Sequence, residues 1–223
     1  MSIFTDSRNA LMVKDMVAAT LREEIISGRL QPDKPIVEAK WGAQLSVAQG
    51  SIREAINILA SEGFVDKGGG RSARVTKLSE DDVRQIYELR APLEGLAASI
   101  LAGKQSEVSD LEQIIGDMGS ALASNNVRAF YERDLQFHMR ICEKTGNRYL
   151  EQNLRRLLVP LFAFVIMRIH GETTEPEHFR RSIDLHKQML EAIRSGDPFF
   201  AEQQVRRTID RFRDGTREIL VKS

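Results

Sequence analysis

The sequence predicts a mainly α-helical protein in two parts, with three helices and a small β-hairpin followed by an all-α helical bundle. Apolar residues recur at helical spacing along most of the 223-residue chain. Helix-favouring residues are abundant, whereas prolines number only six. Strand signals occur in one stretch alone, residues 64–76. We therefore expect one domain at residues 8–76 and a second at residues 79–221.

The first part begins with three predicted helices, which we place at residues 11–27, 37–45 and 48–62. Gly28 is a natural C-cap for the first helix, and Gly63 closes the third. Ser46 and Val47 form a tight turn between the second and third helices. This arrangement is typical of a helix-turn-helix.

A predicted hairpin follows the third helix. Phe64 and Val65 predict a short strand, and residues 72–76 predict the returning strand. The glycines at 68–70 predict the turn between them. A hairpin after a helix-turn-helix makes the domain a winged one.

The second part contains only helical patterns, and we expect helices at residues 79–103, 106–123, 125–144, 147–169, 179–195 and 198–220. Ser79, Asn125 and Asn147 are the predicted N-caps. Pro160 falls inside an apolar stretch and is expected to kink or split its helix. Residues 170–178 are expected to form a loop.

Composition restricts the class of protein only broadly. Lys plus Arg and Asp plus Glu each number 32, so net charge argues neither for nor against a nucleic acid partner. Cys142 is the only cysteine, which excludes an intrachain disulfide. No apolar run approaches about 18 residues, and the N-terminus lacks the apolar core of a signal peptide. We expect a cytoplasmic protein with no membrane partner.

Residues 21–75 resemble the winged helix of the GntR family of bacterial transcription regulators. The resemblance rests on LREEIISGRLQP, on the Ser-Val and Ile-Arg-Glu-Ala pieces of LSVAQGSIREA, and on EGFV before a Gly-rich wing. It implies DNA contacts by Gln49, Ser51, Arg53, Gly70 and Arg71. Arg53 lies off the apolar face of its helix, so it can reach bases or phosphates. The alternative is that Arg53 forms only a surface salt bridge with Glu54 or Asn57.

The start of this recognition helix departs from the family pattern. The family usually has Ser-Arg or Thr-Arg where this chain has Ala48-Gln49, and often Thr-Pro or Thr-Thr where it has Gly50-Ser51. Ala48 cannot cap the helix as serine does. Gln49 favours adenine where arginine favours guanine. We expect either an unusual operator or weaker binding.

The second part resembles the all-helical C-terminal effector domain (FCD) of the FadR-like branch of that family, at residues 78–102, 134–150 and 184–197. Many members of that branch bind a divalent metal through an acidic residue and three histidines. The resemblance implies a site for Zn, Ni or Mn at Asp134, His138 and His186. Asp134 and His138 are four residues apart and share a helix face, and carboxylate and imidazole suit such ions.

The predicted metal site lacks one ligand, because Thr208 stands where the branch has its third histidine. Water or an effector carboxylate could complete the coordination shell. The alternative is a polar core in which Asp134, His138 and His186 only hydrogen-bond one another.

Arg90 matches a position that often faces the effector cavity in that branch. A buried guanidinium needs a carboxylate, which a small organic acid could supply. The alternative is a pair with Glu94, four residues later. Phe162, Phe164 and Met167 are expected in the core or lining a cavity.

Together these features predict a ligand-responsive transcription regulator. We expect a homodimer on a pseudo-palindromic DNA operator, with a small organic acid as effector that relieves repression. Another candidate is a metal-dependent enzyme that uses Asp134, His138 and His186, and a third is an oligomerisation or adaptor module. Neither a nucleophile motif nor a Gly-rich phosphate loop supports an enzyme, and the basic wing argues against an adaptor.

Overall fold

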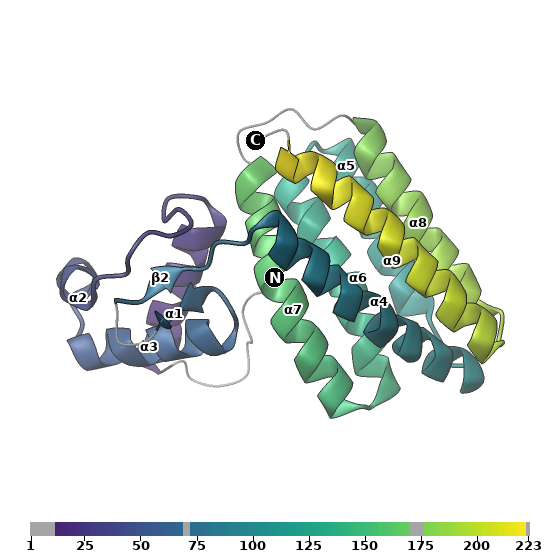
Figure 1. Cartoon of the computed structure of the whole chain (residues 1–223), viewed down its shortest axis with the longest axis horizontal. Helices are drawn as coiled ribbons and strands as arrows, with labels where there is room; N and C mark the ends of the chain where they lie inside the picture. The colour runs from purple at the N-terminus through teal and green to yellow at the C-terminus, as the bar shows by residue number, and fades with distance from the viewer. Residues whose placement is uncertain (1–11, 69–71, 170–175, 222–223) are drawn as a thin grey trace.

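The computed structural model describes residues 12–68, 72–169 and 176–221. Figure 1 shows two lobes, a smaller one formed by the first part of the chain and a larger helical bundle formed by the rest. A short segment after Val75 joins them and leads directly into the first helix of the bundle. Among the described residues, no helix is both long enough and apolar enough to span a bilayer.

The smaller lobe contains α1 (Val13–Ile26), α2 (Glu38–Leu45), α3 (Gln49–Ser61), β1 (Val65–Asp66) and β2 (Arg74–Val75). The two strands are antiparallel, with Val65 opposite Val75. Side chains from the helices form a common core in which Leu21, Ile52 and Leu59 have no solvent exposure. Each such side chain contributes about 1.5–3 kcal/mol relative to an exposed one. The predicted helix-turn-helix and hairpin are confirmed.

Backbone conformations explain where these helices end. Gly28 has φ +73 after α1, a left-handed conformation that glycine adopts without steric penalty. Ser46 has φ +55 in the tight turn between α2 and α3. Ala48 makes no side-chain hydrogen bond at the start of α3, as the sequence predicts. The prediction of Phe64 in a strand is wrong, because β1 begins at Val65 and Phe64 is instead buried in the core.

The larger lobe contains α4 (Glu80–Gly103), α5 (Ser109–Ala123), α6 (Val127–Thr145), α7 (Arg148–Ile169), α8 (Pro176–Arg194) and α9 (Pro198–Val221). α4 and α9 pack against each other, and both lie at the front of the bundle in the view of Figure 1. Their close approach depends on Gly95, since a Cβ there would lie 2.7 Å from Cγ of Arg206. The all-α bundle is confirmed.

The N-caps of this bundle agree with the sequence at two positions and differ at one. Ser79 forms a reciprocal capping box with Asp82, and Asn147 Oδ1 accepts hydrogen bonds from the first turn of α7. The prediction of Asn125 as a cap is wrong. Asn125 has φ +51, and the next residue, Asn126, caps α6 by accepting from the Ala129 amide at 3.0 Å.

Two other boundaries differ from the prediction. α7 is one continuous helix, so Pro160 does not split it. α8 begins at Pro176, inside the segment expected to be a loop, because proline has no amide hydrogen and is well tolerated in the first helical turn.

The end of α3 lies directly against the middle of α7. Gly63 has φ +84, and a Cβ there would lie only 2.4 Å from Cγ of Pro160. Gly63 therefore has two roles, because it ends α3 and also allows this helix to approach the bundle. α1 also contacts α7.

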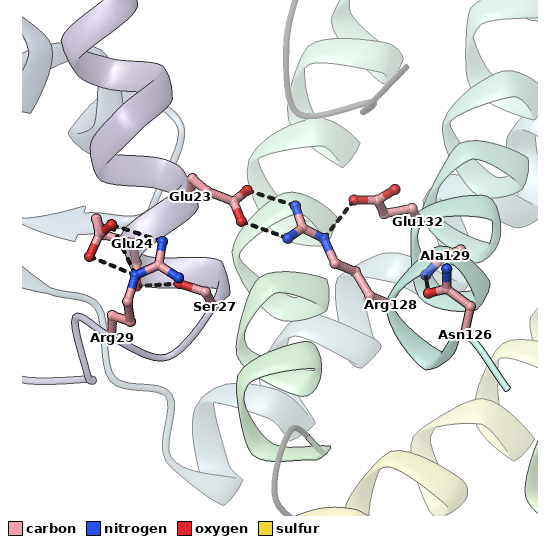
Figure 2. Close-up of polar contacts among 8 residues, drawn as sticks. All are labelled: Glu23, Glu24, Ser27, Arg29, Asn126, Arg128, Ala129 and Glu132. Atoms are coloured by element: carbon pink, nitrogen blue, oxygen red, sulfur yellow. Dashed lines mark hydrogen bonds and ion pairs between the residues drawn. The ribbon is translucent and has the colours of Figure 1, made fainter.

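An ion pair makes a further connection between the lobes (Figure 2). Both carboxylate oxygens of Glu23 on α1 accept hydrogen bonds from Arg128 at the start of α6, at 2.6 and 2.7 Å. Arg128 Nε also donates to Glu132 at 3.1 Å. The smaller lobe is thus tied to the helix that carries Asp134 and His138.

Candidate functional site

Four ionisable side chains from three helices meet inside the larger lobe. Glu94 comes from α4, Asp134 and His138 from α6, and His186 from α8. Asp134 is 5% exposed, and the other three have no exposure. Buried charged groups are rare unless they are paired or bind a ligand, so this cluster is the leading candidate for a binding site in the bundle.

The structure brings together the three side chains proposed from the sequence as metal ligands. Asp134 Oδ1 lies 3.1 Å from Nε2 of His138 and 3.1 Å from Nε2 of His186. One ligand atom from each residue lies within 4.8 Å of the others. The predicted i,i+4 relation of Asp134 and His138 thus places both side chains on one face of α6, where Asp134 also reaches His186 of α8.

The outer nitrogen of each imidazole is held by an acceptor. Nδ1 of His138 lies 2.5 Å from Glu94 Oε2, and Nδ1 of His186 lies 2.7 Å from the Ser182 carbonyl oxygen. Both acceptors require that Nδ1 carries the hydrogen. Each Nε2 therefore faces Asp134 as a potential metal ligand, and such outer hydrogen bonds are typical of metal-binding histidines.

The cluster needs positive charge at its centre. Two imidazole lone pairs and a carboxylate oxygen repel one another unless a proton or a cation lies among them. Burial opposes a charge on His138, but Glu94 outweighs this effect and raises the pKa of His138. Burial likewise opposes ionisation of Asp134, but His186 and His138 outweigh it and lower the pKa of Asp134. The same arrangement suits a divalent ion in place of the protons.

One nitrogen of this cluster has no hydrogen-bond partner. His138 Nε2 is buried and lies 3.1 Å from Asp134 Oδ1, yet it makes no hydrogen bond with any described residue. Buried polar atoms almost always have partners. The unsatisfied nitrogen, together with one carboxylate and two imidazoles, fits a metal such as Zn.

The last helix supplies a wall of the cluster. Thr208 is fully buried, and its hydroxyl donates to the Gln204 carbonyl at 2.9 Å. Phe212, one turn later, contacts the rings of His138 and His186 at centroid distances of 5.6 and 4.9 Å. α9 thus presents a hydroxyl and a phenyl ring on the face where the resemblance implies a histidine.

Arg90 lies beside the cluster and is 1% exposed. Its Nε donates to Glu94 Oε1 at 2.5 Å, so the pair proposed as the alternative is present. The pair does not satisfy the guanidinium, because Nη2 is buried without a partner among the described residues. The Arg90 Cζ atom lies 5.0–5.8 Å from the centroids of three aromatic rings, those of Tyr87, Phe162 and Phe212.

Sequence reasoning missed the central position of Glu94. The i,i+4 spacing indicated its pair with Arg90, but His138 lies 44 residues away in the chain. No local pattern predicts that contact. Glu94 bridges the two groups, with one oxygen on Arg90 and the other on His138.

The second candidate site is the exposed face of α3. Gln49 and Arg53 are exposed and Ser51 is half-buried, whereas Gly70 and Arg71 lie outside the described residues. Arg53 forms an ion pair with Glu38 of α2, which corrects the proposed partners Glu54 and Asn57. Their positions on the same helix suggested those partners, but Glu54 pairs with Lys14 and Asn57 accepts a hydrogen bond from Lys67.

Comparisons with known proteins agree with both lobes. Residues 13–75 match the family described as bacterial regulatory proteins, gntR family, and residues 85–211 match the FCD domain. A gluconate operon transcriptional repressor of Bacillus subtilis (strain 168) is 27% identical over 206 residues, which cover 91% of this chain and 84% of that protein. The repressor of the same name from Bacillus licheniformis is 29% identical over 184 residues, with 81% and 75% covered.

The solved structure of E. coli McbR/YncC shares the fold, with a TM-score of 0.76 at 15% identity. The match covers 94% of this chain and 99% of that one.

Proposed function

Since this chain belongs to the GntR family of bacterial regulatory proteins, we propose that it is a repressor that binds its operator as a homodimer and responds to a small organic acid. The matched domains are those of a transcription regulator with a DNA-binding domain and an FCD effector domain. We propose that these domains span residues 8–76 and 79–221.

One observation supports ligand binding above all. Two buried nitrogens, Arg90 Nη2 and His138 Nε2, have no hydrogen-bond partner among the described residues. Leaving such groups unpaired is unfavourable, and Glu94 holds both side chains in place. An anionic ligand beside Arg90 and a cation beside His138 would satisfy these two nitrogens.

We assign the cation to a divalent metal, namely Zn, Ni or Mn, held by Asp134, His138 and His186. When bound, the ion would supply positive charge at the centre of the cluster and an open position for an oxygen ligand. Thr208 leaves the protein with three ligands, so the effector or water would provide the rest.

We assign the anion to a carboxylate effector that contacts Arg90. Guanidinium groups bind carboxylates through paired hydrogen bonds, and the aromatic rings around Arg90 exclude water, which strengthens the interaction. The names of the Bacillus relatives support this class of effector, because gluconate is itself a carboxylate.

The proposed DNA contacts are Gln49, Ser51 and Arg53 of the recognition helix with Gly70 and Arg71 of the wing. Two such surfaces related by a two-fold axis suit a pseudo-palindromic operator. Leu89 and Leu96, two turns apart on α4, are 55% and 44% exposed and support a homodimer through this lobe. A regulator of this kind works beside the chromosome, which supports a cytoplasmic location.

The ion pair of Arg128 with Glu23 supports communication between the two sites. Arg128 and the metal-site residues Asp134 and His138 lie on the same helix, while Glu23 lies on α1 of the DNA-binding lobe. A shift of α6 on ligand binding would be transmitted to α1. Such a shift changes operator affinity only if the ligand binds the two arrangements differently.

The metal assignment is tested by elemental analysis of untagged protein purified without chelator, followed by Zn titration against a chromophoric chelator. We expect a bound divalent ion and a higher affinity in Thr208→His, which supplies a fourth ligand. Asp134→Asn is the control that should weaken binding. Absence of metal after addition of Zn, Ni and Mn would refute the metal site and leave the regulator function to the DNA test.

The DNA assignment is tested with a duplex that the wild-type protein selects from a randomised pool. We expect Arg53→Ala to lower affinity for this duplex about tenfold or more. Arg84→Ala removes another exposed, ion-paired arginine from the larger lobe and should change nothing. Equal binding by wild type and Arg53→Ala would contradict the assigned contact.

A further inference from the structure

The exposed arginine of the recognition helix is held in a fixed direction by a neighbouring helix. Arg53 Nε lies 3.1 and 3.2 Å from the two Glu38 oxygens, and Nη2 lies 2.8 Å from Oε2. The carboxylate therefore covers the Nε–Nη2 edge of the guanidinium, and Nη1 takes no part in the pair. The Arg53 side chain nevertheless stays 65% exposed.

A guanidinium has a second edge that can bind in the same way. Its five N–H groups form a planar fork, and the Nη1–Nη2 edge carries two donors that point away from Nε. In the major groove, paired donors of arginine recognise the O6 and N7 atoms of guanine. Glu38 can thus hold one edge of Arg53 while the other edge contacts a base.

Resting on the proposed DNA-binding role of Arg53, we propose that Glu38 is a specificity-determining residue that positions Arg53 to read guanine. An ordered guanidinium loses less conformational freedom when it binds a base. The negative charge of Glu38 also weakens attraction to phosphates at this surface, and phosphate contacts carry no sequence information. Both effects raise the preference for the correct sequence.

The surroundings of the pair support this role. Glu38 is the first residue of α2, and Arg53 is exposed on α3, off the buried face that contains Ile52 and Ile56. The nearby wing residue Lys67 donates to Asn57, one turn after Arg53, at 2.5 Å. The pair thus lies on the face that also holds the base of the wing.

The test measures sequence discrimination with Glu38→Gln, which keeps the shape of the side chain and removes its charge. The probes are a duplex that wild-type protein selects from a randomised pool and the same duplex with its sequence shuffled. We expect the ratio of the two affinities to fall roughly 5- to 100-fold, the range for loss of one paired base contact. Affinity for the shuffled duplex should stay equal or rise.

Glu54→Gln is the matched control. Glu54 is the next residue after Arg53 and is exposed, but it faces Lys14 of α1 at 3.8 Å. The variant makes the same change in charge on α3, the helix that carries Arg53, and leaves the Arg53–Glu38 pair intact, so we expect the discrimination ratio to stay at the wild-type value. An equal fall in both variants would show a general charge effect and overturn the proposal.

A double variant separates positioning from direct contact. If Glu38 acts through Arg53, Glu38→Gln should have no further effect on discrimination in an Arg53→Ala background. A persistent effect would mean that Glu38 contacts a base itself, which would overturn the proposal. Unchanged discrimination in the single variant Glu38→Gln would do the same while leaving the DNA-binding function intact. Failure of wild-type protein to select any sequence would refute both.

Discussion

Two arginine–glutamate pairs of this chain have the same chemistry and opposite surroundings. In the larger lobe, the Arg90 and Glu94 side chains are 1% and 0% exposed, whereas in the smaller lobe those of Arg53 and Glu38 are 65% and 31% exposed. Breaking a buried pair leaves an unpaired charge in a dry interior. Breaking an exposed pair returns both groups to water. Burial thus decides whether a pair is essential for folding or is available for recognition.

Among the variants that test this comparison, Glu94→Ala is expected to cause the largest loss of stability. The variant leaves the buried Arg90 guanidinium without its carboxylate and removes the hydrogen-bond partner of His138. We expect the free energy of unfolding, measured by urea titration with chelator present, to fall by about 3–5 kcal/mol.

Glu38→Ala is the control for that experiment. It breaks the corresponding exposed pair, so its denaturation midpoint should match that of wild type. If Glu94→Ala and Glu38→Ala lowered the free energy of unfolding equally, burial would not distinguish a pair that supports folding from one that supports recognition.

A smaller effect is expected for the half-exposed pair that joins the lobes. Glu23→Ala and Arg128→Ala should show a coupling energy of about 0.5–1 kcal/mol in a double-mutant cycle of thermal unfolding. The side chains of Arg128 and Glu23 are 33% and 45% exposed. In exposure, this pair therefore lies between Arg90–Glu94 and Arg53–Glu38.

The coupling between the lobes should depend on pH in a defined direction. Hydrogen bonds from Arg128 lower the pKa of Glu23 below its usual value near 4.5. A lowered pKa means that the stabilisation is fully present above the unfolded value and disappears as the pH falls through the folded value. Coupling that persists in acid, or that weakens as pH rises, would contradict this account.

The sequence predicted the local features of the fold well. Periodicity located the helices, and the Ser79 and Asn147 caps followed from residue type. It placed the α6 cap one residue early, because Asn125 and Asn126 are chemically identical and only the backbone shows which one enters the helix. Hydrophobic periodicity also could not show that the helix containing Pro160 stays continuous, because this depends on packing.

The candidate sites were predictable only where they follow one helix or a family resemblance. Spacing placed Asp134 and His138 on one face, and resemblance added His186. Glu94 and His138 are 44 residues apart, and Glu38 and Arg53 are 15 apart on different helices. Their contacts depend on how helices pack, which no local pattern encodes.

The burial of the proposed metal ligands would also set the timescale of the response. Asp134, His138 and His186 are at most 5% exposed, so a ligand reaches them only when neighbouring helices part. Openings of this kind in folded proteins occur over microseconds to seconds. If the proposed ligand binds there, its rate of binding would be limited by how often the bundle opens, and it would leave only through the same rare opening. In a cell, such a regulator would stay bound to its effector for a short time after the free compound has disappeared.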